Sequence, residues 1–213
     1  MVGTGLGDES PSEYLQWPMF VTAVAPNAKA LNRAFLLIQG FEKSEHLSDS
    51  KWTVFSSRNL PSTTLPPTSS PFSPRSRNDF AGLSQEGINA FMNQHWTQLD
   101  EMSFTFELWM ILDQTGLDTD TCVICKHPYN GDDEPATWGY SDEFEALRVP
   151  LDQACAVYAS LYTGREFEDY RGVGKWPDGS YQFARNAAKM KDSEALEREE
   201  KVWESWRNQG FVD

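Results

Sequence analysis

The stretch from residue 103 to residue 127 constrains the fold of this chain most, because it contains two strand-like runs joined by a short turn. Residues 103–113, SFTFELWMILD, alternate between polar and apolar and then become continuously apolar, which is typical of a buried β-strand. The residues TGLDTD turn the chain, and TCVICKH at 121–127 predicts the next strand. We therefore expect a sheet in the middle of the domain.

The segments on either side mix strand and helix signals, which predicts an α/β or α+β single domain with a central mixed sheet flanked by helices. Asn27 and Ser84 precede amphipathic runs and are candidate helix caps. The expected strands are 17–24, 51–57, 144–150 and a short extended piece at 178–183. The expected helices are 28–42, 80–94, 151–162 and 191–210, with a short helical turn at 166–172.

The predicted organisation is a flexible tail over residues 1–16, one domain over 17–190 and a charged C-terminal helix within 191–213. A Pro/Ser-rich insertion at 59–78 interrupts the domain. Its five prolines exclude a helix and a central strand. The insertion is a lid over a pocket, a docking segment or a tolerated surface insertion, and we favour the last because long surface loops cost little free energy.

The composition of the chain limits the kinds of partner that it can bind and indicates the cellular compartment. The formal charge of −14, from 32 acidic and 18 basic residues, argues against a nucleic-acid ligand and against anionic membranes. No run of about 18 apolar residues is present to span a membrane. The N-terminal sequence lacks the pattern of a secretory signal, and three cysteines form no disulfide framework. We therefore expect a cytoplasmic protein.

Several short motifs between residues 80 and 183 resemble a small, mainly bacterial family known only as a domain of unknown function. The matching stretches are Ala81–Ser84, Leu108–Asp113, Cys122–Lys126, Leu147–Val149 and Glu166–Tyr170. The resemblance implies an α/β fold over about half of the chain. It implies no reaction and no cofactor.

Cys122, Cys125 and His127 are the residues that most suggest a metal or redox site. A structural zinc ion needs about four ligands, and this chain offers one cysteine pair without a second pair. In a strand, two side chains three residues apart point to opposite faces. We therefore interpret the pair as buried strand residues, with a metal or redox site as the alternative. No phosphate-binding loop or nucleophile elbow is present either, so we expect no metal and no cofactor.

Three residues are candidates for a catalytic site: His127 and Asp113 for acid–base catalysis, and Arg148 to stabilise an anion or a carbonyl group. His127 and Asp113 each end a predicted strand, so His127 could be a base that Asp113 orients. The alternative is a surface histidine beside a turn. Arg148 interrupts the apolar strand ALRVP; it either faces solvent or, if buried, requires a carboxylate partner or an anionic ligand.

Aromatic residues make up 13% of the chain, with eight tryptophans and thirteen phenylalanines, and could line a binding pocket. Ordinary core packing is the alternative for all of them. The candidate substrate-binding residues are Trp109, Tyr129, Trp138, Tyr140 and Tyr158.

These observations favour a cofactor-independent enzyme of the isomerase, cyclase or lyase type, acting on a small, fairly apolar metabolite in an aromatic pocket. The alternative is a non-enzymatic interaction or regulatory module, which an exposed Trp203 or Trp206 would favour. The expected partner is a small-molecule ligand, and a homo-oligomer is compatible with the sequence.

Overall fold

One mixed sheet of seven strands forms the centre of the computed structural model, which describes residues 16–39, 51–63, 65–69, 71–72, 77–128, 142–184 and 193–213. The predicted fold class, α/β or α+β with a central mixed sheet, is confirmed. The strands are β1 (Trp17–Val21), β2 (Trp52–Phe55), β3 (Leu108–Leu112), β4 (Thr121–Lys126), β5 (Glu145–Pro150), β6 (Arg171–Lys175) and β7 (Tyr181–Phe183). The helices are α1 (Ala28–Ile38), α2 (Gln85–Glu101), α3 (Gln114–Thr119), α4 (Leu151–Tyr162) and α5 (Ser193–Asn208), with the 3₁₀ turn η3 at Phe167–Asp169.

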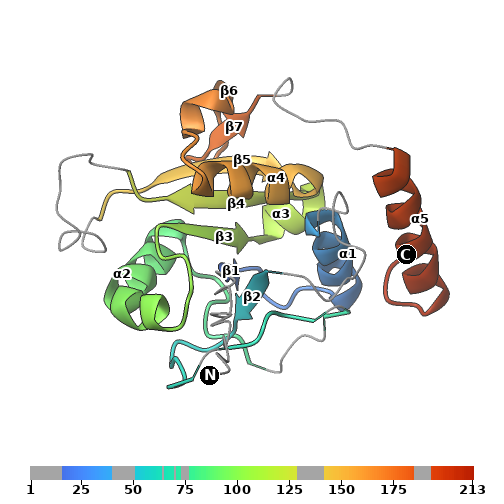
Figure 1. Cartoon of the computed structure of the whole chain (residues 1–213), viewed down its shortest axis with the longest axis horizontal. Coiled ribbons are helices and arrows are strands. Elements are labelled where there is room, and N and C mark those ends of the chain that lie inside the picture. The colour runs from blue at the N-terminus through green and yellow to red at the C-terminus, as the bar shows by residue number, and fades with distance from the viewer. Residues whose placement is uncertain are drawn as a thin grey trace, which may run out of the picture.

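The order of strands across the sheet is β2-β1-β3-β4-β5-β7-β6 (Figure 1). Strand β1 is parallel to both of its neighbours, whereas β3, β4 and β5 form an antiparallel series. Strand β7 is parallel to β5 and antiparallel to β6. Because β3 and β4 run in opposite directions, Asp113 at the end of β3 lies beside the beginning of β4.

Helices pack on both faces of the sheet, because strand side chains alternate between the two faces. On one face, α1 and α4 pack against side chains that include Met110 and Ile124. On the other face, α2 packs against side chains that include Trp109 and Val123. Helix α2 begins after Ser84, whose hydroxyl accepts the Gly87 N–H, so the predicted cap is confirmed.

Helix α1 ends at Ile38 and α2 runs from Gln85 to Glu101, so both differ in their bounds from the predicted helices 28–42 and 80–94. Two further segments differ in type. The expected turn after β3 contains the short helix α3, because the Asp113 side chain caps it by accepting the Gly116 N–H over 2.7 Å. The expected helical turn at 166–172 ends early, and β6 begins at Arg171. Pairing with β7, rather than apolar alternation, brings this exposed RGVGK segment into the sheet.

The C-terminal helix α5 lies against α1, at the end of the molecule opposite α2 (Figure 1). Leu36 of α1 packs with Trp206 and Val212, and all three side chains are buried. The Arg33 guanidinium lies 5.5 Å from the centre of the Trp203 ring. An exposed Trp206, which would have favoured a docking role for this helix, is therefore not observed: it is 5% exposed.

Candidate functional site

The described part of the proline-rich segment follows the outer edge of β2. The Thr68 N–H donates to the Trp52 carbonyl over 2.7 Å, and the Thr68 hydroxyl accepts the Val54 N–H over 2.8 Å. One threonine thus pairs two backbone groups that an edge strand would otherwise leave open to other chains. The segment covers this edge without becoming a strand itself, as its prolines require.

Side chains of the same segment reach the cores on both faces of the sheet. Leu60 and Leu65 pack against the core beneath α2. Phe72 packs against the opposite core, where its ring stacks on Phe35 with a centroid distance of 5.0 Å. The absence of helix and strand that the sequence predicts holds for the described residues of 59–78. Their contacts make them a component of the packed domain rather than a loosely attached insertion.

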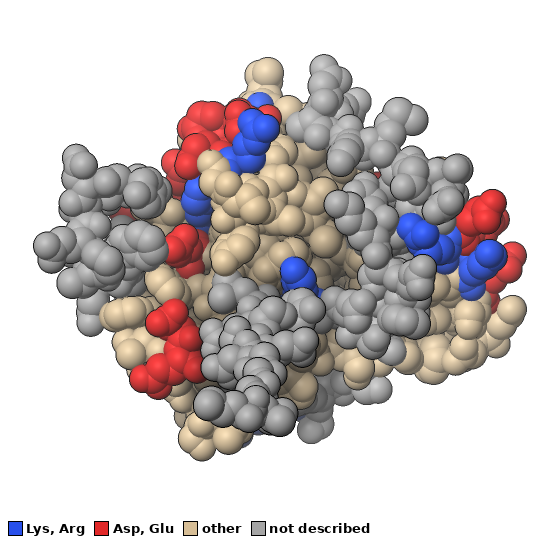
Figure 2. Space-filling view, in the orientation of Figure 1, with Lys and Arg blue, Asp and Glu red and all other residues tan. Residues whose placement is uncertain are grey.

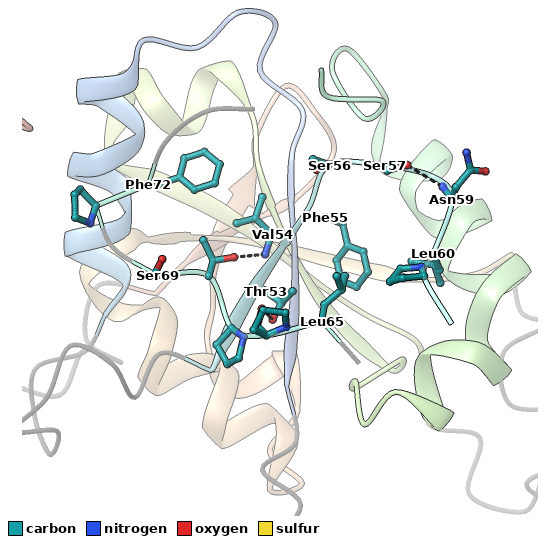
Figure 3. A pocket seen from close by; sticks show the side chains of 15 residues that line it. Thr53, Val54, Phe55, Ser56, Ser57, Asn59, Leu60, Leu65, Ser69 and Phe72 are labelled. Carbon is teal, nitrogen blue, oxygen red and sulfur yellow. Dashed lines mark hydrogen bonds between the residues drawn. The ribbon is translucent and has the colours of Figure 1, made fainter. Parts of the chain in front are cut away.

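A cavity of about 540 Å³ lies between β2 and this segment (Figure 3). Pockets that bind small molecules typically measure roughly 300–1,000 Å³. Among the described residues, fifteen line the cavity, all of them within 53–72: five apolar side chains, four prolines, five hydroxyl-bearing side chains and one asparagine. None of these lining residues is charged, although the chain carries a net charge of −14.

A second arrangement of interest surrounds Arg148 of β5, whose side chain is 1% exposed. Its Nη1 and Nη2 donate to the two carboxylate oxygens of Asp113 over 3.0 and 2.6 Å. Nη2 also donates to Asp178, in the turn between β6 and β7. The Trp176 ring completes the enclosure, with its centre 5.2 Å from the guanidinium. The sequence left open whether Arg148 faces solvent or is buried beside a carboxylate, and the structure shows the latter.

Burial and the neighbouring charges shift the pKa values of this cluster in opposite directions. Burial would lower the pKa of Arg148, but the carboxylates of Asp113 and Asp178 raise it above its usual value, so the guanidinium stays charged. Burial would likewise raise the pKa of Asp178, but hydrogen bonds from Ser180 and Arg148 hold it below its usual value. Both carboxylates are 26% exposed, so this ion cluster is buried on one side and open to water on the other.

The structure does not bring His127 to Asp113. His127 follows β4, and its backbone N–H donates to the backbone carbonyl of Glu107, just before the start of β3. Asp113 follows the other end of β3. The predicted orientation of His127 by Asp113 is therefore wrong, because it assumed that both strands end at the same edge. His127 Nε2 lies 2.8 Å from the Asn89 side-chain oxygen instead. Burial lowers the pKa of His127 to about 4, so the ring is neutral at neutral pH.

The structure describes two of the five residues predicted to line an aromatic pocket, Trp109 and Tyr158, and these two do not share a pocket. Trp109 belongs to the core beneath α2, and Tyr158 to the core beneath α1 and α4. The sheet therefore separates the two side chains, and both are fully buried. Core packing, the alternative that the sequence left open, accounts for both. Tyr129, Trp138 and Tyr140 lie outside the described residues.

Cys122 and Cys125 occupy β4 and point to opposite faces of the sheet, as the sequence predicts. Burial raises the pKa of both thiols well above its usual value, which disfavours the thiolate that a metal site or a nucleophile requires. Among the residues that the structure describes, no group of three histidine, cysteine or acidic side chains is arranged to hold a metal ion.

Sequence reasoning missed the cavity and two members of the Arg148 cluster. Asp178 and Trp176 belong to a turn about thirty residues away from Arg148, and nothing in their spacing indicates the contact. A signal for the cavity was present, however. Leu60, Leu65 and Phe72 are large apolar residues spaced between prolines, which is unusual in a segment with no packing role.

Comparisons with known proteins add no family to this description. No family model matches the chain, and neither a curated protein nor a solved structure matches it significantly. The resemblance to a domain of unknown function therefore stays a prediction. Within the described parts of the chain, no helix has the length and apolar character needed to cross a bilayer.

Proposed function

We propose that this protein binds a small, uncharged and fairly apolar molecule in the cavity between β2 and residues 57–72. The observation that carries the proposal is the cavity itself, at about 540 Å³ and with no charged residue among the fifteen described residues that line it. A charged ligand would lose its hydration there without meeting an opposite charge. An uncharged ligand of matching size would bury apolar surface against Val54, Phe55 and Phe72.

The cavity supports binding better than catalysis. Acid–base chemistry needs a titratable side chain within hydrogen-bonding distance of the reacting atoms. The fifteen lining residues that the structure describes include no histidine, acid, lysine or cysteine. The proposal therefore agrees with the small-molecule ligand expected from the sequence, and it belongs with the non-enzymatic module rather than with the enzyme.

Binding of an apolar fluorophore tests the proposal. Phenylnaphthylamine is uncharged and becomes fluorescent in apolar sites, so titrating it into the full chain gives a dissociation constant. Ser69 lines the cavity and is exposed, so Ser69→Trp should fill the cavity without disturbing the core. We expect Ser69→Trp, and independently Val54→Phe, to weaken binding at least tenfold.

A matched control separates the cavity from the rest of the surface. Val173 is 95% exposed on β6, the strand at the opposite edge of the sheet from β2, so Val173→Phe adds the same side chain far from the cavity. Val173→Phe should bind the fluorophore with the same affinity as the unmodified protein. The proposal would be refuted if the fluorophore did not bind, or if both cavity variants bound it as tightly as the control.

The acid–base enzyme expected from the sequence is the second candidate, and the Arg148 cluster is the observation that favours it. Asp113 and Asp178 present two partly exposed carboxylates around one buried guanidinium, and a carboxylate can accept a proton from a bound molecule as a general base. Incubating a metabolite extract with the protein and comparing the products by mass spectrometry would test it. Turnover that Asp178→Asn abolishes and Asp118→Asn leaves intact would support this candidate, and no turnover would remove it.

A further inference from the structure

Two of the hydroxyl groups that line the cavity already have acceptors within the protein. The Thr53 hydroxyl donates to the Gln16 side-chain oxygen over 2.6 Å. The Ser57 hydroxyl accepts the Asn59 N–H over 3.1 Å and bonds to the Asp79 carboxylate. A hydroxyl has a single proton to donate. Neither group is therefore available as a donor to a ligand.

Thr68 differs from these two. Its hydroxyl accepts the Val54 N–H over 2.8 Å, a bond drawn as the dashed line at Val54 in Figure 3. This bond fixes the oxygen at the cavity wall and occupies one lone pair. Its own N–H donates to the Trp52 carbonyl, so the backbone on which the side chain stands is held as well. Within the described part of the chain, the proton of this hydroxyl has no acceptor. Thr68 therefore offers a donor whose oxygen and backbone are both fixed by hydrogen bonds to β2, whereas Asn59 and Ser69 in the same wall are exposed.

We infer that the ligand of this cavity carries a neutral hydrogen-bond acceptor, such as a ketone, ester or amide carbonyl, between apolar groups, and that Thr68 selects for it. The inference rests on the proposed function. A purely apolar ligand would displace water from the Thr68 hydroxyl and leave its proton unpaired, which costs binding free energy. A site with a fixed donor discriminates against analogues that lack the acceptor for the same reason.

Benzophenone and diphenylmethane test the inference, because the two molecules have nearly the same size and differ in one carbonyl oxygen. Each is titrated as a competitor against phenylnaphthylamine bound to the full chain. We expect benzophenone to compete at concentrations about tenfold lower than diphenylmethane, the difference that one neutral hydrogen bond supplies. Thr68→Ser keeps the hydroxyl and should keep this preference. Thr68→Val removes the hydroxyl, so benzophenone and diphenylmethane should compete at similar concentrations.

The outcomes distinguish this inference from the proposed function. Equal competition by the two molecules in the unmodified protein would overturn the role of Thr68 while leaving the cavity as the binding site. A preference that persists in Thr68→Val would also overturn it. The proposed function itself would be refuted if the fluorophore did not bind, or if Ser69→Trp and Val54→Phe both bound it as tightly as the Val173→Phe control does. Because the comparison in the unmodified protein stands alone, the inference stays testable even if Thr68→Val fails to fold.

Discussion

Replacing Arg148 with methionine should destabilise the protein by about 3 kcal/mol, because it leaves two carboxylates facing each other without their shared cation. Removing one partner of a buried ion pair costs about 3–5 kcal/mol when the remaining charge stays buried. Arg148 donates three hydrogen bonds to Asp113 and Asp178, and a weaker one to Thr121 over 3.4 Å. Both carboxylates are 26% exposed and can recover water, which places the expected loss at the lower end of that range.

Urea unfolding followed by tryptophan fluorescence measures this loss, which should also lower Tm by about 6–12 °C for a chain of this size. Arg165→Met is the matched control, since the Arg165 side chain is 69% exposed and lies 3.8 Å from Asp169; its loss should stay within about 0.5 kcal/mol. Adding Asp178→Asn to Arg148→Met removes one of the repelling charges and should recover part of the stability.

Acidification gives an independent check on the same reasoning. The pKa of Asp178 is lower in the folded protein than in the unfolded chain, so its contribution to stability is present above the unfolded pKa and disappears as the pH falls through the folded pKa. The difference in stability between the unmodified protein and Arg148→Met should therefore shrink in acid. The account of the cluster would fail if Arg148→Met cost no more than Arg165→Met, or if the difference did not depend on pH.

Three further predictions concern groups outside the cluster. Asn32→Leu should cost about 1–3 kcal/mol in urea unfolding, because the buried Asn32 amide joins the proline-rich segment to the C-terminal tail; a loss below about 0.5 kcal/mol would contradict this. The pKa of His127 is about 4 when folded and about 6.5 when unfolded, so stability should fall as the pH drops from about 6.5 to 4. In His127→Gln this pH dependence should be weaker, and an NMR titration that places the His127 pKa above 6 would refute it. Iodoacetamide should modify Cys155 in the folded protein and the two buried cysteines of β4 only after unfolding, which peptide mass spectrometry can show.

The sequence predicted the local elements well where side-chain periodicity is strong. The apolar run that ends at Asp113 is β3, TCVICK is β4, and the Ser84 cap begins α2. Periodicity failed for β6, whose RGVGK sequence is mostly exposed and enters the sheet only by pairing with β7. A strand that has no buried face carries no hydrophobic pattern from which it could be recognised.

Site prediction failed for His127 because it did not use the direction of the strands, although the connection between the two predicted strands is too short for a parallel pair. Two strands joined by a short turn are antiparallel in this fold, so their C-terminal ends lie at opposite edges of the sheet, and His127 does not reach Asp113. Asp113 and Arg148 do meet, because β3 and β5 both flank β4. The contact of Asp178 with Arg148 depends on how the β6–β7 hairpin folds back on the sheet, which is a property of tertiary structure rather than of spacing.

The proline-rich segment shows a different limit of sequence reasoning. Its prolines correctly exclude helix and central strand, but they do not indicate whether the segment packs. Thr68 pairs the edge of β2 and Phe72 stacks on Phe35, so the segment forms one wall of the cavity. The apolar residues between the prolines were the part of the pattern that pointed to this role.

Photolabelling with benzophenone tests the central claim most directly, because light attaches the bound molecule to the C–H groups that surround it. The full chain is irradiated with benzophenone, digested, and mapped by peptide mass spectrometry. The cavity assignment predicts that the label falls within residues 53–72 and that Ser69→Trp suppresses it, whereas Val173→Phe does not. A label concentrated elsewhere, for example on α5, and unchanged by Ser69→Trp would contradict the assignment of this cavity as the binding site.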